Sequence, residues 1–126
     1  MDTPEQMLQK IHSLLEKNPK YKLEAYSFAL SALHYTMQKI NPLRHITGQE
    51  FCKGIRAYAL DQFGPMVCSV FEYWGITGTI DFGNIVFAMV DLGLMRKTEE
   101  DSINDFKDVY DFKKAFSAKA AIEMQP

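Results

Sequence analysis

The sequence lacks a long apolar run and has few cysteines, and these two absences limit its class. Its apolar runs, such as Ile85–Val90, fall far short of the roughly 18 residues that a membrane-spanning helix needs. The start, Met1–Glu5, has no basic region followed by an apolar stretch, so we expect neither a signal peptide nor membrane contact. The two cysteines, Cys52 and Cys68, fit a reducing compartment. We therefore expect a cytoplasmic protein without a disulfide.

Nothing in the composition indicates disorder. Of the 126 residues, 47% are hydrophobic and 24% are charged, so residues 1–126 are expected to form a single globular domain. The charge is unevenly distributed. Residues 1–56 contain eight Lys or Arg against five acidic residues, whereas residues 57–126 contain six against eleven. The two halves of the chain would therefore favour different partners.

Helix start and stop signals divide the first half of the chain. Thr3-Pro4 is typical of a helix start and Asn18-Pro19 of its end, which predicts an N-terminal helix within residues 1–18. A second helix is expected over Lys22–Ile40, with apolar residues on two faces. Thr47-Gly48-Gln49-Glu50 forms a capping box that opens a third helix. Gly64-Pro65 should end that helix and start a short fourth one.

The second half predicts a helix-turn-helix followed by a β-hairpin. The tight turn Gly75–Gly78 leads into a fifth helix that Thr79 should cap and Gly93 should end. Residues 94–97 and 106–112 read as two strands around a polar loop, and residues 113–126 as a last short helix and tail. We therefore predict a mainly α fold with a minor β part. It has a helical core over residues 22–93 and a winged-helix-like hairpin over residues 94–112.

Between Tyr26 and Phe116 the chain resembles a family of small uncharacterised bacterial proteins, a domain of unknown function. The segments that carry the resemblance are Tyr35-Thr36, Ile46–Glu50, Gly54–Ala59, Gln62–Pro65, Trp74–Ile76, Asp81–Phe87, Lys97–Asp101 and Asp105–Phe112. The first helix lies outside it. The resemblance implies a shared fold and implies no activity, ligand or partner.

Charge argues against nucleic-acid binding through the helix-turn-helix. No Lys or Arg occurs from Ala57 to Met95, and the predicted hairpin is acidic, so both would repel a phosphate backbone. An alternative is nucleic-acid (RNA or DNA) binding through the basic N-terminal half. The candidate contacts for that alternative are Lys20, Lys22, Lys39, Arg44, Lys53 and Arg56.

No group of residues predicts catalysis, and no cofactor is implied. The histidines His12, His34 and His45 lack the short ligand spacing of a zinc motif. Cys52 lies near a helix start beside a lysine, which would modestly favour its thiolate, but the sequence places no base next to it. We therefore predict no metal site and regard an enzyme as the least favoured class.

The preferred hypothesis is a protein-interaction or regulatory module. Its contact surface would be the acidic hairpin with its aromatic residues, and its partner would be a protein, for which an acidic surface favours a basic one. The predicted contact residues are Glu99, Glu100, Asp101, Asp105, Asp108 and Tyr110.

Overall fold

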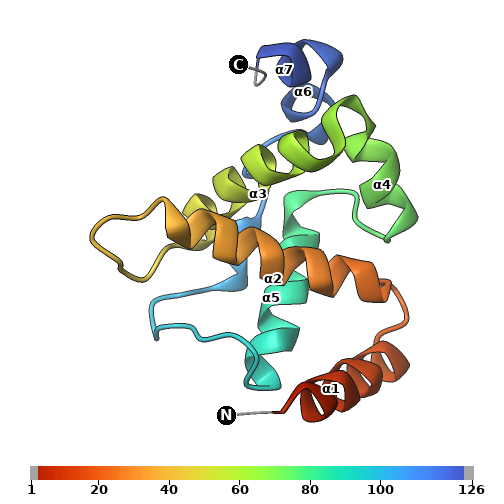
Figure 1. Ribbon diagram of the computed structural model, residues 1–126, viewed down its shortest axis with the longest axis vertical. Helices are drawn as coiled ribbons and strands as arrows, with labels where there is room; N and C mark the ends of the chain where they lie inside the picture. The colour runs from red at the N-terminus through yellow and green to blue at the C-terminus, as the bar shows by residue number, and fades with distance from the viewer. Residues whose placement is uncertain (1–2, 124–126) are drawn as a thin grey trace.

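The computed structural model describes residues 3–123, and most of this stretch is helical (Figure 1). The predicted mainly α class is therefore confirmed. Within the described residues, no helix is both long and apolar enough to cross a membrane. The last residues of the tail that we assigned to the C-terminal segment, 124–126, lie outside the described part of the chain.

The first two helices follow the predicted signals. Helix α1 covers Pro4–Lys17, and Thr3 caps it by accepting a hydrogen bond from the backbone N–H of Gln6 at 3.2 Å. Helix α2 covers Leu23–Gln38 and so ends earlier than Ile40. It packs against both α3 and α5, as expected for a helix with two apolar faces.

The predicted capping box opens α3, which covers Gly48–Phe63. The Thr47 hydroxyl accepts from the Glu50 N–H at 3.1 Å, and the Glu50 carboxylate accepts from the Thr47 N–H at 3.0 Å. Gly64, with φ of 54°, ends this helix. A short 3-10 helix, η1 (Gly64–Met66), then leads into α4 (Val67–Tyr73).

Helix α5 covers Thr79–Asp91, and its N-cap is Gly78 rather than Thr79, so the predicted cap was wrong by one residue. Asp81 takes over the capping role, because its carboxylate accepts from the Gly78 N–H at 3.2 Å. The buried Thr79 hydroxyl instead donates to the carbonyl of Phe106 at 2.6 Å. It thereby fixes the segment that follows α5.

Aromatic side chains fill the centre of the molecule, where α2 crosses α5 in Figure 1. Phe71 of α4 lies 5.4 Å from Phe28 of α2 and 5.3 Å from Phe82 of α5, measured between ring centroids. Each of these pairs is close to edge-on, a favourable arrangement. Helix α1 lies at one end of this core and the C-terminal helices lie at the other (Figure 1).

The predicted β-hairpin over residues 94–112 was wrong. The described residues contain no strand, and this segment forms a loop, then the 3-10 helix η2 (Ile103–Phe106), then a second irregular stretch. Helices α6 (Phe112–Ala115) and α7 (Ala118–Glu123) complete the chain. Phe106, Val109 and Phe112 do not alternate strictly, so no strand could place all three on one face.

Phe106 anchors this non-helical segment between α3 and α5. The side chain is 4% exposed, and a glycine faces it from each helix. A Cβ atom built on Gly48 would lie 2.8 Å from the Phe106 ring, and one on Gly83 would lie 2.9 Å from the Phe106 Cβ. Both distances are too short for a real contact, so the two glycines make room for the phenylalanine. This contact brings the loop against the helices.

Candidate functional site

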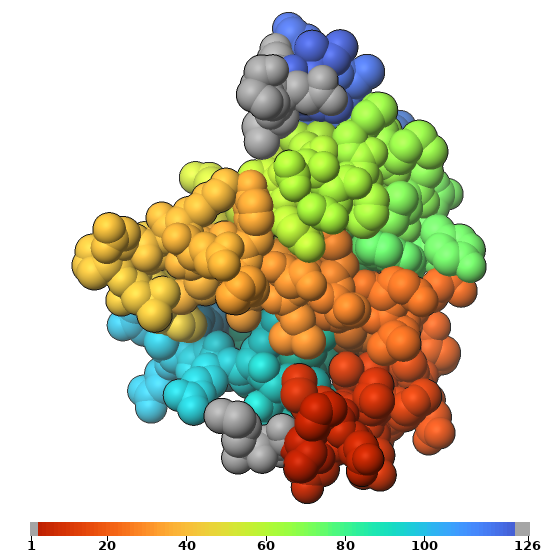
Figure 2. Space-filling model, in the orientation of Figure 1, coloured from red at the N-terminus to blue at the C-terminus, as the bar shows by residue number. Residues whose placement is uncertain are grey.

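A pocket of about 320 Å³ lies between α2, the start of α3, α5 and the loop at residues 94–106. We call it the α2–α5 pocket. In Figure 2 the yellow segment that joins α2 to α3 lies directly above the cyan segment that follows α5. The pocket is lined from both segments. Its volume is at the lower end of the range for small-molecule sites, roughly 300–1,000 Å³.

The interior of the α2–α5 pocket is apolar. Helices α2, α3 and α5 contribute part of its lining, and the loop after α5 contributes the rest. The apolar lining residues are Leu33, Met37, Ile46, Phe51, Val86, Phe87, Leu94, Met95 and Phe106. Two of them are methionines, whose flexible side chains adapt to differently shaped ligands.

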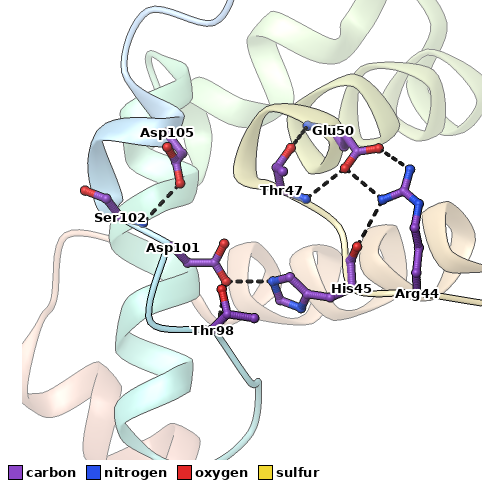
Figure 3. A network of polar contacts seen from close by, with 8 residues as sticks. All are labelled: Arg44, His45, Thr47, Glu50, Thr98, Asp101, Ser102 and Asp105. Carbon is purple, nitrogen blue, oxygen red and sulfur yellow. Dashed lines mark hydrogen bonds and ion pairs between the residues drawn. The ribbon is translucent and has the colours of Figure 1, made fainter.

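A hydrogen bond joins two segments that line the pocket (Figure 3). The ring Nε2 of His45, from the segment before α3, lies 2.6 Å from Oδ2 of Asp101, from the loop after α5. The same Asp101 oxygen accepts from the backbone N–H of Thr98 at 2.8 Å. Burial raises the pKa of Asp101, but the hydrogen bonds from Thr98 and His45 outweigh it and hold that pKa below its usual value. These hydrogen bonds therefore stabilise the ionised form of Asp101.

A second group of contacts fixes the segment that carries His45. Arg44 binds the Glu50 carboxylate through two nitrogens, at 3.0 and 2.6 Å, and also donates to the carbonyl of His45 at 3.0 Å. The hydrogen bonds that Glu50 accepts from Arg44, and after them the one from the Thr47 N–H, lower its pKa to about 2. Figure 3 shows this network beside the His45–Asp101 contact. The capping box of α3 thus also positions one wall of the pocket.

The acidic and the basic residues that line the pocket differ in whether they have hydrogen-bonding or ion-pair partners. Asp105 accepts from the backbone N–H of Ser102 at 3.0 Å, so both acids of the lining, Asp101 and Asp105, have partners within the chain. Arg96 and Lys97 also line the pocket and are exposed. Neither forms an ion pair with another residue in the described part of the chain. The lining therefore holds two acidic side chains that have hydrogen-bonding partners and two basic side chains that have no ion-pair partner among the described residues.

The six acidic-surface residues predicted from the sequence do not form one surface. Glu99 and Glu100 are exposed at the tip of the turn formed by residues 98–101, which we call the acidic turn. Asp108 is exposed elsewhere, on the border of a broader hollow of about 650 Å³ beside α4. Tyr110 is half-buried, and its hydroxyl donates to the carbonyl of Cys52 at 2.7 Å. Asp101 and Asp105 take part in the contacts described above.

The predicted basic residues lie at opposite ends of α2. Lys20 binds Asp81 at 2.9 Å, and Lys22 lies 4.7 Å from the centre of the Tyr73 ring; both precede the helix. Lys39 donates to the Tyr35 hydroxyl at 2.6 Å at the other end, and Arg44 follows it. A helix of 16 residues is roughly 24 Å long at about 1.5 Å per residue, which separates the two groups.

The other two predicted basic residues lie on α3. Lys53 is exposed, whereas Arg56 is half-buried and donates from Nε to the carbonyl of Ala115 at 3.1 Å. Arg56 therefore holds α6 against α3. The structure thus brings these basic residues together in no continuous patch along which a phosphate backbone could run.

Neither cysteine has the properties of a nucleophile. Cys52 is fully buried, and burial raises its pKa to about 12. The thiolate preference that we expected from its place near a helix start is therefore wrong. Cys68 is half-buried, and burial together with the charges of Asp111 and Glu72 raises its pKa as well. No group of three His, Cys, Asp or Glu residues suited to a metal ion occurs within residues 3–123.

Comparison with known proteins gives no match: no protein-family model, no curated protein and no solved structure matches this chain. The resemblance to a family of uncharacterised bacterial proteins therefore stays a prediction.

Sequence reasoning did not identify the pocket. Its lining combines residues near position 46 with residues near position 96, and no local pattern joins the two. One signal was nevertheless available. Thr98 and Asp101, like Ser102 and Asp105, are spaced as a capping box, which predicts that these acids bind nearby backbone N–H groups.

Proposed function

We propose that this domain binds a small, largely apolar molecule in the α2–α5 pocket and acts as a ligand-binding regulatory module. The observation that carries this proposal is the apolar lining of a pocket of about 320 Å³ beside fixed polar groups. Apolar pockets with a few convergent polar groups are the usual form of small-molecule sites. The His45–Asp101 contact and the capping box of α3 hold the two walls, so the site exists before a ligand binds.

Binding fits the pocket better than catalysis does. Hydrolytic enzymes with a catalytic triad contain a histidine that is held by a carboxylate, as His45 is held by Asp101. The triad also needs a nucleophile bonded to the histidine. Within residues 3–123 no hydroxyl or thiol is hydrogen-bonded to the His45 ring, and the Cys52 thiol is buried. The pair is therefore interpreted as a structural contact between two loops.

Methionine methyl groups give a direct test of ligand binding. Met37 and Met95 line the pocket, while Met66 is 58% exposed and lies outside its lining. In protein labelled with ¹³C-methyl methionine, a library of small apolar compounds should contain members that shift the Met37 and Met95 signals and leave the Met66 signal unchanged. Equal shifts at all three, or none with any compound, would contradict the proposal.

A pocket-filling variant provides the matched control. Val86→Phe adds volume inside the lining, whereas Val90→Phe adds the same volume one turn later on α5, outside it. Far-UV circular dichroism establishes that each variant is folded. Ligands found with the wild type should lose affinity for Val86→Phe at least tenfold and retain it for Val90→Phe. Unchanged affinity for Val86→Phe would place the bound compounds elsewhere.

A second candidate function is the protein contact predicted from the sequence, and the acidic turn favours it. Glu99 and Glu100 are exposed and form no ion pair with the described residues. The double variant Glu99→Lys/Glu100→Lys should abolish binding to lysine- and arginine-rich peptides, and Glu5→Lys/Glu16→Lys on α1 is its charge-matched control. Equal peptide binding by both double variants would refute this candidate.

A further inference from the structure

We propose that the ligand of the α2–α5 pocket is an amphipathic carboxylate: its apolar chain lies in the pocket and its carboxylate lies at Arg96 and Lys97. This inference rests on the proposed function and adds the chemical class of the ligand. It commits to a free small molecule rather than to a membrane or a protein segment. Three features of the pocket support it: two basic side chains without an ion-pair partner, the acidic residues that follow them in the chain, and the apolar lining.

The two basic side chains of the lining have no ion-pair partner among the described residues. Asp101 and Asp105, by contrast, already accept hydrogen bonds from His45 and from backbone N–H groups. Arg96 and Lys97 have no acidic partner among the described residues. An arginine guanidinium matches the two oxygens of a carboxylate, and a lysine adds a second donor. A ligand with an anionic head therefore gains contacts that a neutral one lacks.

The neighbouring acids limit the charge that the head can carry. Glu99 and Glu100 lie two and three residues after Lys97 in the chain and are exposed without a cationic partner among residues 3–123. Their negative charge opposes a polyanion more strongly than a single carboxylate. This argues for a monoanion and against nucleotides or other ligands with several phosphates.

The apolar lining determines which chemical groups the rest of the ligand contains. Phe51, Phe87 and Phe106 line the pocket with the two methionines, and none of these side chains carries a hydrogen-bond donor for a polar ligand. Burial of each CH₂ group contributes about 0.8 kcal/mol, which corresponds to roughly fourfold tighter binding. Affinity should therefore rise by about that factor with each added carbon until the pocket is filled.

The test compares ligands that share a chain and differ in head group. Isothermal titration of the purified chain with decanoate, 1-decanol and decyltrimethylammonium, each below its micelle concentration, separates chain binding from charge recognition. We expect decanoate to bind at least tenfold more tightly than decanol, and the ammonium compound to bind most weakly. Octanoate should bind roughly 16-fold more weakly than decanoate, from two CH₂ steps.

Two double variants then test whether Arg96 and Lys97 bind the carboxylate. Arg96→Gln/Lys97→Gln should reduce decanoate affinity to that of decanol and leave decanol binding unchanged. Lys114→Gln/Lys119→Gln, two exposed lysines on α6 and α7, removes the same charge far from the pocket and should change neither. Both double variants alter exposed side chains, so both should fold.

Each outcome has a distinct meaning. Equal binding of decanoate and decanol by the wild type would overturn the carboxylate assignment and leave the proposed function standing. Binding to anionic lipid vesicles without binding to monomeric decanoate would overturn the commitment to a free ligand. If no amphiphile binds and no apolar compound shifts the Met37 and Met95 signals, both the inference and the proposed function fail.

Discussion

Asp81 connects three parts of the chain. Its replacement by alanine should remove a large fraction of the free energy of unfolding of the domain. The residue is 2% exposed. Its Oδ1 atom accepts from the Tyr21 hydroxyl at 2.5 Å and from Lys20 Nζ at 2.9 Å. Its Oδ2 atom accepts from the backbone N–H groups of Thr77 at 2.8 Å and Gly78 at 3.2 Å. The carboxylate thus holds the α1–α2 connection and the turn before α5 together.

The cost of removing this carboxylate follows from the donors that it leaves. A buried donor without a partner costs about 1–3 kcal/mol. The Tyr21 hydroxyl belongs to a residue that is only 5% exposed. Leaving this hydroxyl without its Asp81 acceptor should therefore cost a free energy at the upper end of this range. Water can reach the N–H groups of Thr77 and Gly78 more easily, and the Lys20 side chain is 60% exposed. We therefore expect Asp81→Ala to lower the free energy of unfolding by about 3–5 kcal/mol.

Urea denaturation followed by far-UV circular dichroism measures this loss. Asp81→Asn keeps one acceptor oxygen and should cost about 1–2 kcal/mol, and Lys20→Gln should cost less than about 1 kcal/mol. Domains of this size have a total stability of about 5–15 kcal/mol, so these three variants should be well separated. A loss below about 1 kcal/mol for Asp81→Ala would refute the assignment of Asp81 as a connecting residue.

The same group gives the stability of the domain a pH dependence. Burial raises the pKa of Asp81, but the hydrogen bonds from Tyr21, Thr77 and Lys20 outweigh it and hold that pKa below its usual value. A carboxylate with a lowered pKa in the folded state stabilises above its unfolded pKa of about 3.9, and this contribution is lost as the pH falls through the folded pKa. The stability difference between wild type and Asp81→Asn should therefore shrink below about pH 4.

Two further predictions concern the packing of the core. Gly48→Ala and Gly83→Ala should each lower the free energy of unfolding by about 1–3 kcal/mol, because a Cβ atom at either position overlaps Phe106. Urea denaturation tests this prediction, and a gain in stability in either variant would contradict it. In the native protein a thiol reagent should label Cys68 slowly and leave Cys52 unlabelled until urea is added, because burial raises the pKa of Cys52 to about 12. Mass spectrometry identifies the labelled residue, and rapid native labelling of Cys52 would contradict its burial.

Most of the helix boundaries could be predicted because they depend on local chemistry. A capping box such as Thr47–Glu50 involves residues three positions apart, and Pro or Gly acts on its own backbone. The segment after α5 could not be predicted in this way. Its course depends on Phe106, which fits against Gly48 and Gly83, two residues that lie far from it in the chain. Propensity alone therefore suggested strands where tertiary packing imposes a loop and a 3-10 helix.

The acidic residues of this chain illustrate how a charge run can be misinterpreted. Asp101 and Asp105 each lie three residues after a hydroxyl residue whose backbone N–H they bind, and Asp81 binds the N–H of Gly78 three residues before it. An acid in this position satisfies a backbone donor at the start of a turn or helix, which is a contribution to folding. It is therefore a poor indicator of an external partner.

The predicted acidic surface therefore contains two classes of residue, and only one of them can report a contact with a partner. Charge reversal at Asp101 would remove the acceptor of the Thr98 N–H and the His45 contact, so a loss of binding in that variant would report damage to the loop. Glu99 and Glu100 bind no backbone donor in the described structure, and reversal there changes charge without removing a contact. A genuine acidic contact must therefore respond to Glu99→Lys/Glu100→Lys alone. If binding responds only when Asp101 is also changed, the residue acts through the fold of the pocket wall.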